Sequence, residues 1–320
     1  MKRFLFCFAV LLLVCLPSCV EEYPEPLYDP LKNTGEARKK VSTEVNGGVF
    51  YDFYNDMTAE ASYYDPELLG SDTVIPESIN GYRVTRIGDE CFRGSRLTEI
   101  VLPEGLEEIG ERAFYQTSLS FVFFPDRLKT IGKEAFDNCR QLKKASFGSG
   151  IEEIGTGAFY GTALEEIDLS GGCKTIGEEA FASLSNLKKL LLPDNLEEIG
   201  PYAFFSCTSE DLAIQIPDGV KKIGYGAFHG TAFEKTLTQE WVILGDGVLI
   251  RYNGTTPTPI IPAGVKYLAC GFEGTAVNEI TLPDSLQGVC PVALERLKSK
   301  NLSFQGSDAI LSTLFQGEVK

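Results

Sequence analysis

Apolar and polar residues recur in one fixed order along most of this chain. A complete unit, residues 97–114, reads LTEIVLPEGLEEIGERAF, and its second half returns as LKTIGKEAF at 128–136 and LEEIGPYAF at 196–204. The isoleucine that precedes the glycine recurs every 22 to 24 residues between Ile87 and Ile223. One unit cannot bury its own apolar face but stacked units can, so the period predicts a repeat solenoid.

Each unit predicts two short strands and one turn. The alternating, β-branched EIVL at 99–102 favours a strand that ends at Pro103, which cannot donate to a ladder. LEEI at 106–109 predicts a second extended segment, and Gly110 allows a sharp turn after it. ERAF at 111–114 is then expected to form a helical turn that points its Ala and Phe inward.

The phenylalanine of each turn forms a column along the chain. Its members are Phe92, Phe114, Phe136, Phe159, Phe181, Phe204 and Phe228. Rings at one fixed spacing could line a ligand site. A solenoid must fill every layer, however, so we interpret the column as a core spine.

Two motifs, I-x-L-P followed by I-G-x-x-A-F, recur across roughly residues 74–290. On these motifs the chain resembles the BspA-like leucine-rich repeat proteins of bacterial surfaces. The resemblance implies a leucine-rich repeat solenoid of short parallel strands and helical turns at 84–320, with a hairpin insertion near 238–258 and a C-terminal cap. An N-terminal β cap is expected at 47–83. The family also implies adhesion to host matrix proteins, other bacteria or glycans.

The first residues are typical of a lipoprotein signal peptide. The basic MKR precedes 13 apolar residues, and LPSC at 16–19 resembles a bacterial lipobox, cut before its cysteine. We therefore expect a signal peptide at 1–18, lipid on Cys19 and a flexible tether at 19–46. The VEE that follows resembles the export signal of Bacteroidetes surface lipoproteins, which favours an outer-membrane protein facing the cell exterior. An ordinary secretory signal with an incidental cysteine is the alternative.

Net charge bears on the class of partner, and the positions of the cysteines bear on disulfide formation. The formal net charge of −16 argues against a nucleic-acid partner, because phosphate binding needs clustered Lys and Arg. Six cysteines lie beyond the predicted lipid site, and the two that share a repeat column, Cys139 and Cys207, stand three repeats apart. We therefore expect no disulfides. Membrane contact is expected only through the lipid anchor, and the protein is expected to be a monomer.

No set of residues that could carry a reaction stands out. His229 is the one histidine, so a histidine metal cluster or a Ser-His-Asp triad is not expected. Acidic residues are numerous, which leaves a two-carboxylate hydrolase open. However, the residues before each Ile-Gly alternate between acidic and basic from unit to unit, as Glu152 and Lys174 do, which is expected of a stabilising ladder across stacked strands. We predict no catalytic activity, no cofactor and no metal.

The outward face of the first strand in each unit is the predicted binding surface. In L-x-x-I-x-L the third and fifth residues point outward. The candidate ligand contacts at these positions are Glu99, Val101, Phe121, Phe123, Lys144 and Leu191. Apolar side chains clustered on a sheet surface favour a contact site, unless the N-terminal cap or tether covers them.

The predicted function is therefore non-catalytic binding or adhesion at the cell surface, with a host matrix protein or another bacterial surface as partner. The alternative is an accessory glycan-capture lipoprotein of a polysaccharide-uptake system. In that case Phe121 and Phe123 would form an aromatic platform for the glycan.

Overall fold

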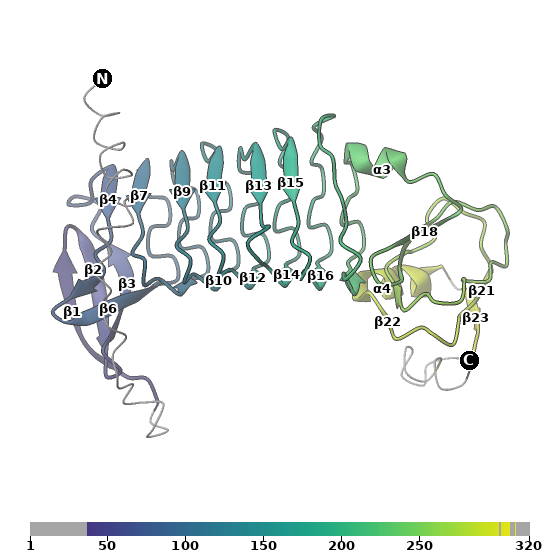
Figure 1. Cartoon of the computed structure of the whole chain (residues 1–320), viewed down its shortest axis with the longest axis horizontal. Helices are drawn as coiled ribbons and strands as arrows, with labels where there is room; N and C mark the ends of the chain where they lie inside the picture. The colour runs from purple at the N-terminus through teal and green to yellow at the C-terminus, as the bar shows by residue number, and fades with distance from the viewer. Residues whose placement is uncertain (1–36, 301, 308–310, 312–320) are drawn as a thin grey trace. The chain divides into compact units, whose positions relative to one another are not determined.

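The computed structural model describes residues 37–300, 302–307 and 311. The chain divides into two compact units, residues 1–39 and 40–320, and the architecture below is that of the second. This unit is a β-solenoid of about 11 turns, with short parallel strands and little helix (Figure 1). The predicted solenoid is therefore confirmed.

One wall of the solenoid is a ladder of two-residue strands, here called rung strands. They are β8 (Glu108–Ile109), β10 (Thr130–Ile131), β12 (Glu153–Ile154), β14 (Thr175–Ile176), β16 (Glu198–Ile199) and β17 (Lys222–Ile223). Each pairs in parallel with the next, so that Ile131 lies between Ile109 and Ile154. These isoleucines are completely buried, because the segment LEEI presents its apolar ends to the interior of every turn.

The opposite wall carries three-residue strands, here called face strands. They are β4 (Asp72–Val74), β7 (Glu99–Val101), β9 (Phe121–Phe123), β11 (Lys144–Ser146), β13 (Glu166–Asp168) and β15 (Lys189–Leu191). Parallel pairing joins β4 to β7, β9 to β11 and β13 to β15. The middle residue of each face strand points inward, and the two flanking residues point outward, as the alternation of the sequence predicted.

The turn that carries the repeat phenylalanine is not the helical turn expected from the sequence. Arg112 and Glu134 each adopt a φ of 53°, which a right-handed helix does not contain. The N–H of Phe114 donates to the carbonyl of Ala135 at 2.8 Å, and the N–H of Phe136 donates to that of Ala158 at 2.7 Å. Alternate backbone hydrogen bonds therefore run from one turn to the next, and those between them close tight turns, as from Tyr115 to Arg112 at 3.1 Å, so no helix continues.

The repeat phenylalanines stack along the interior of the solenoid. From Phe92 to Phe228, successive ring centroids lie 4.9 to 5.9 Å apart, with ring planes 2° to 14° from parallel. All seven rings are buried. The predicted core spine is confirmed.

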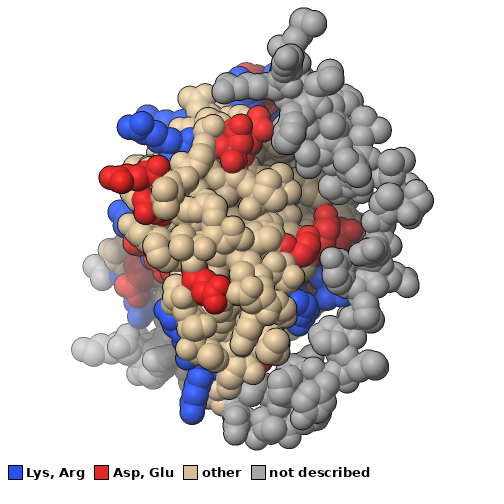
Figure 2. Space-filling model, turned by 90° about the vertical axis from the view of Figure 1, so that its left-hand side faces the viewer, with Lys and Arg blue, Asp and Glu red and all other residues tan. Residues whose placement is uncertain are grey.

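The first turn is covered by an antiparallel sheet of β1 (Lys40–Asn46), β2 (Val49–Tyr54) and β3 (Thr58–Tyr64). Strand β3 pairs in parallel with β6 (Tyr82–Ile87), which pairs with β8 and, on its other part, with β5 (Ser78–Ile79), so this cap and the rung strands form one sheet. Seen end-on, the middle of this surface consists mostly of residues that are neither acidic nor basic (Figure 2).

Strand β1 occupies residues 40–46, which the sequence placed in the flexible tether. The strand pairs with β2 through its backbone, while all seven of its side chains are exposed. No alternation of apolar and polar residues marks a strand of this kind, so the tether boundary was set too late in the chain.

The array changes after β17. The elements that follow are α3 (Ala232–Thr236), β18 (Trp241–Leu244), β19 (Val248–Tyr252), β20 (Tyr267–Leu268), β21 (Glu279–Thr281), β22 (Gly288–Val289), α4 (Pro291–Ser299) and β23 (Ser303–Gln305). Strands β18 and β19 form an antiparallel hairpin, and β19 also pairs in parallel with β20, which pairs with β22. Leu268 pairs with Val289, so parallel pairing between successive turns resumes here.

Candidate binding surface

The six predicted ligand contacts all lie on face strands, but they differ in exposure. Phe123 is 48% exposed, Val101 and Leu191 are each 39% exposed, Lys144 is exposed, and Glu99 and Phe121 are half-buried. Only part of the predicted set is therefore both apolar and open to solvent.

Val74, which was not among the predicted contacts, extends this apolar surface by one turn. It is 67% exposed and pairs with Val101 across the ladder between β4 and β7. Strand β9 follows on the next turn, where the N–H of Ser120 donates to the carbonyl of Thr98 at 3.2 Å. Val74, Val101 and Phe123 thus occupy the same outward position on three successive turns, and we call them the apolar row.

A sequence signal for Val74 was present. The segment DTVIP at 72–76 keeps the order of acidic, apolar and proline residues of EIVLP at 99–103, except that Thr73 replaces the inward isoleucine. Thr73 is buried like Ile100, its partner in the ladder. Because of this threonine, the first face strand does not match the apolar pattern of the other face strands.

Polar and acidic side chains bound the apolar row. Phe123 pairs with Ser146 on β11, and Asp168 holds the equivalent outward position on β13, so the row ends there. Leu191 comes one turn later and is separated from the row by these two residues. At the other outward position of β4 and β7, Asp72 pairs with Glu99, which places two carboxylates beside the two valines.

The alternation of acidic and basic residues before the repeat glycine forms ion pairs between turns. Nζ of Lys174 lies 3.0 Å from the carboxylate of Glu152, and Nζ of Lys221 lies 2.8 Å from that of Glu197. All four side chains are about half exposed or more, so each pair contributes little on its own. The predicted stabilising ladder is confirmed for these turns.

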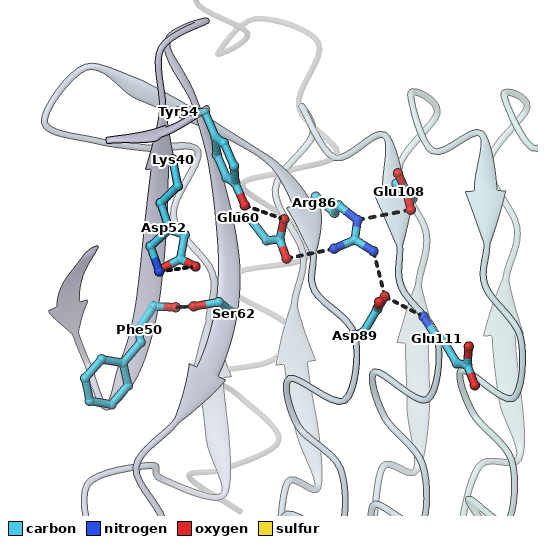
Figure 3. A network of polar contacts seen from close by, with 10 residues as sticks. All are labelled: Lys40, Phe50, Asp52, Tyr54, Glu60, Ser62, Arg86, Asp89, Glu108 and Glu111. Carbon is cyan, nitrogen blue, oxygen red and sulfur yellow. Dashed lines mark hydrogen bonds and ion pairs between the residues drawn. The ribbon is translucent and has the colours of Figure 1, made fainter. Parts of the chain in front are cut away.

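A second charged group joins the cap to the repeats (Figure 3). The guanidinium of Arg86 on β6 donates to Glu60 on β3 at 2.7 Å, to Asp89 at 2.6 Å and to Glu108 on β8 at 3.0 Å. Burial alone would lower the pKa of Arg86, but its bonds to Glu108, Glu60 and Asp89 outweigh burial and raise it. The hydroxyl of Tyr54 also donates to Glu60, so every group in the cluster has a partner and its role is structural.

The thiols are poor candidates for chemistry. Cys91, Cys139, Cys173, Cys207, Cys270 and Cys290 are free and buried. Burial raises the pKa of Cys139 and Cys173 to about 11 and that of Cys207 to about 12, so these thiols carry almost no thiolate at neutral pH. Sγ of Cys139 donates a hydrogen bond to the carbonyl of Phe114 at 3.0 Å, so this thiol serves the structure of the core.

The expectations for the N-terminal segment concern residues that the structure does not describe. The predicted signal peptide, the lipid site at Cys19 and the tether up to residue 36 lie outside the described residues. Within the described part, no helix is both long and apolar enough to cross a bilayer. In the same part, no three His, Cys, Asp or Glu side chains come together in a way that could hold a metal ion.

Solved structures of bacterial leucine-rich repeat proteins share this fold. A leucine rich cell surface protein of Faecalibacterium prausnitzii A2-165 is 23% identical with a TM-score of 0.54, over 84% of this chain and 77% of that one. A leucine-rich repeat protein of Bacteroides ovatus ATCC 8483 is 25% identical with a TM-score of 0.53, over 83% of this chain and 67% of that one. No curated protein sequence matches the chain.

The repeat itself identifies the family. A family model of the BspA type leucine rich repeat region, with 6 copies, matches residues 72–188 and 107–235. These matches together span residues 72–235, just over half of the chain, and contain all the face and rung strands of the regular array. The chain belongs to the BspA-type leucine-rich repeat family.

Proposed function

We propose that the protein is a non-catalytic binding protein of the cell surface that holds another protein through the apolar row. The observation that carries this proposal is the exposure of Val74, Val101 and Phe123 on three successive turns of a rigid sheet. Solvent-exposed apolar groups that are contiguous and fixed in place are typical of contact sites, whereas scattered ones are common on any surface.

The chemistry around the row favours a partner that offers both apolar and basic groups. Asp72 and Glu99 lie side by side at the edge of the row, and the whole chain carries a formal net charge of −16. Complementary charge around an apolar centre speeds association and fixes orientation, while the apolar centre provides most of the affinity. A basic segment of a host matrix protein or of another bacterial surface protein would suit this arrangement.

A glycan is the less favoured ligand of this surface. Stacking of a sugar needs a flat, open ring face, and Phe121 is half-buried, which leaves Phe123 as the exposed ring of β9. The two valines of the row offer no ring at all. We therefore keep glycan capture at Phe121 and Phe123 as the second candidate for this surface.

The anchoring of the protein belongs to the same proposal. A lipid on Cys19 would hold the solenoid at the outer membrane, facing the cell exterior, where a binding surface has access to partners. Similarity to a leucine rich cell surface protein of F. prausnitzii supports a surface location. Metabolic labelling with a palmitate analogue should mark the wild-type protein and not a Cys19→Ser variant.

The binding proposal can be tested with residues 21–320 on an array of host matrix proteins, bacterial surface proteins and polysaccharides. A Val101→Ser/Phe123→Ser variant should lose a protein ligand that the wild type retains. Leu191→Ser is the matched control, because Leu191 has the same position in its unit and the same exposure as Val101 but lies outside the row. A ligand that both variants bind equally well would show that another surface is used, and a polysaccharide lost with the double variant would favour glycan capture.

A further inference from the structure

A cavity of about 670 Å³ lies where the regular array ends. Its lining comes from the last two regular turns, from α3, from the end of β19, from residues 270–273 after β20 and from α4. The volume falls within the range that proteins use to hold small molecules. Residues more than 90 positions apart in sequence meet in it, as Tyr202 and Arg296 do.

The cavity exists because the aromatic spine is interrupted. Phe204 and Phe228 still stack at 5.9 Å, but the chain then leaves the array as α3 and the hairpin. Tyr252 and Phe272, whose ring centroids lie 5.4 Å apart with planes tilted by 47°, belong to a separate buried cluster. Phe228 and Tyr252 both line the cavity, so the space lies between the end of the spine and this second cluster.

Four half-exposed or exposed rings form one wall. Tyr225 meets Tyr202 edge to face at 5.7 Å, Tyr202 meets Phe205 in the same way at 5.8 Å, and Phe205 stacks with the ring of His229 at 5.7 Å. On the earlier turns the position of Phe205 is held by Tyr115, Asp137, Tyr160 and Ala182, so no two adjacent turns there both carry a ring. The continuous wall of rings is therefore a property of this end of the array, and not of the repeat.

Two pairs of oppositely charged side chains face the same cavity. The carboxylate of Glu234 on α3 accepts hydrogen bonds from Arg251 on β19 and from the N–H of Gly230, and it also lies 3.1 Å from Nδ1 of His229. The guanidinium of Arg296 lies over the ring of Tyr225, 4.4 Å from its centroid, with Glu273 3.8 Å away. Two carboxylates and two guanidinium groups cancel in charge, while the side chains of Arg251, Glu273 and Arg296 remain between 35% and 47% exposed.

We propose that this cavity binds a neutral saccharide of one or two sugar rings. Flat aromatic faces suit the C–H faces of a sugar ring, and planar guanidinium and carboxylate groups that are held in place match pairs of neighbouring hydroxyl groups. A strongly charged ligand would be repelled by one charged side chain for each one that attracts it. A purely apolar ligand would remove water from the charged side chains without replacing its hydrogen bonds. The site is separate from the apolar row and does not depend on the function proposed for it.

The experiment measures binding of the full chain to neutral sugars by calorimetry and by saturation-transfer NMR. Glucose, galactose, mannose, N-acetylglucosamine, maltose, cellobiose and lactose are the probes, at concentrations up to the millimolar range. At least one probe is expected to bind saturably. Phe205→Ala and Arg251→Gln are each expected to weaken that binding about tenfold, since each removes one stacking face or one hydrogen-bonding group.

Two control variants separate this site from the fold and from the apolar row. Tyr160→Ala changes a ring at the repeat position of Phe205 but two turns away, and the wild-type chain already has Ala182 at that position in the turn between them. Phe123→Ser alters the apolar row. Both variants should bind the sugar as the wild type does. Absence of saturable binding to every probe would overturn the proposal, and so would binding that survives both Phe205→Ala and Arg251→Gln, whereas neither result bears on protein binding at the apolar row.

Discussion

The rings of Phe136 and Phe159 stack with their centroids 5.2 Å apart and their planes 2° from parallel. Each ring thus packs against the rings of the two adjacent layers. Because the two residues hold the same place in successive repeats, a change in one ring alters two layers of core packing.

Replacement of this ring by a small side chain should destabilise the solenoid strongly. Phe136 is completely buried, and Phe136→Ala should lower the free energy of unfolding by about 4 kcal/mol, from lost burial and the cavity left behind. Urea denaturation followed by circular dichroism measures the change. Phe123→Ala is the matched control on an exposed ring, expected within about 1 kcal/mol of the wild type. Equal effects of the two substitutions would contradict the core role of the spine.

The junction at Arg86 should be needed to hold the cap on the first repeat. Arg86→Met would leave Glu60 partly buried without its cation, and we expect a loss of about 2–3 kcal/mol of stability. Limited proteolysis should then cut first within residues 40–64. Arg93→Met removes an exposed arginine paired with Glu90 and should change stability by less than about 0.5 kcal/mol. A cap as resistant to protease in Arg86→Met as in the wild type would show that β-sheet pairing alone holds it.

The repeat glycine is required for close approach of neighbouring turns. A Cβ at Gly155 would come within 2.8 Å of backbone atoms of Gly132 and Lys133. Gly155→Ala should therefore prevent these turns from stacking and lower the free energy of unfolding by roughly 3 kcal/mol or more. Gly157→Ala tests a different glycine of the same turn. Its φ is +61°, close to the conformation that Glu134 adopts at the same position of the preceding turn. We therefore expect Gly157→Ala to lower the free energy of unfolding by only about 1 kcal/mol. Comparison of the two melting temperatures distinguishes steric contact from backbone strain.

Asp137 should make stability depend on pH in the acid range. Burial, and then the nearby carboxylate of Glu134, raises the pKa of Asp137 to about 6 from its ordinary value of 3.8. The folded state therefore holds this proton more tightly than the unfolded state, so stability falls as the pH rises from about 4 to about 6. Asp137→Asn should be more stable than the wild type at pH 7, by about 1 kcal/mol after allowance for solvent screening, and no more stable at pH 3.5. A stability difference that is the same at both pH values would exclude this ionisation as its cause.

Sequence analysis could predict the binding surface only in part. The outward positions of Val101 and Phe123 follow from strand alternation, but the half-burial of Phe121 depends on how neighbouring turns pack. Val74 was missed because Thr73 interrupts the apolar pattern of its strand. The cavity could not be predicted from periodicity, since it forms where the periodicity stops and segments distant in the chain meet.

The repeated pattern was enough to establish the solenoid, its two strands per turn, the buried spine from Phe92 to Phe228 and the charge ladder, because each of these depends on contacts between equivalent residues of adjacent units. The form of the phenylalanine turn is set by backbone hydrogen bonds between adjacent turns, which do not depend on which side chains the turn carries. The pairing of β1 with the cap and the meeting of Tyr202 with Arg296 join residues that are not equivalent in the repeat. Such contacts leave no period in the sequence, so they become visible only once the chain is folded.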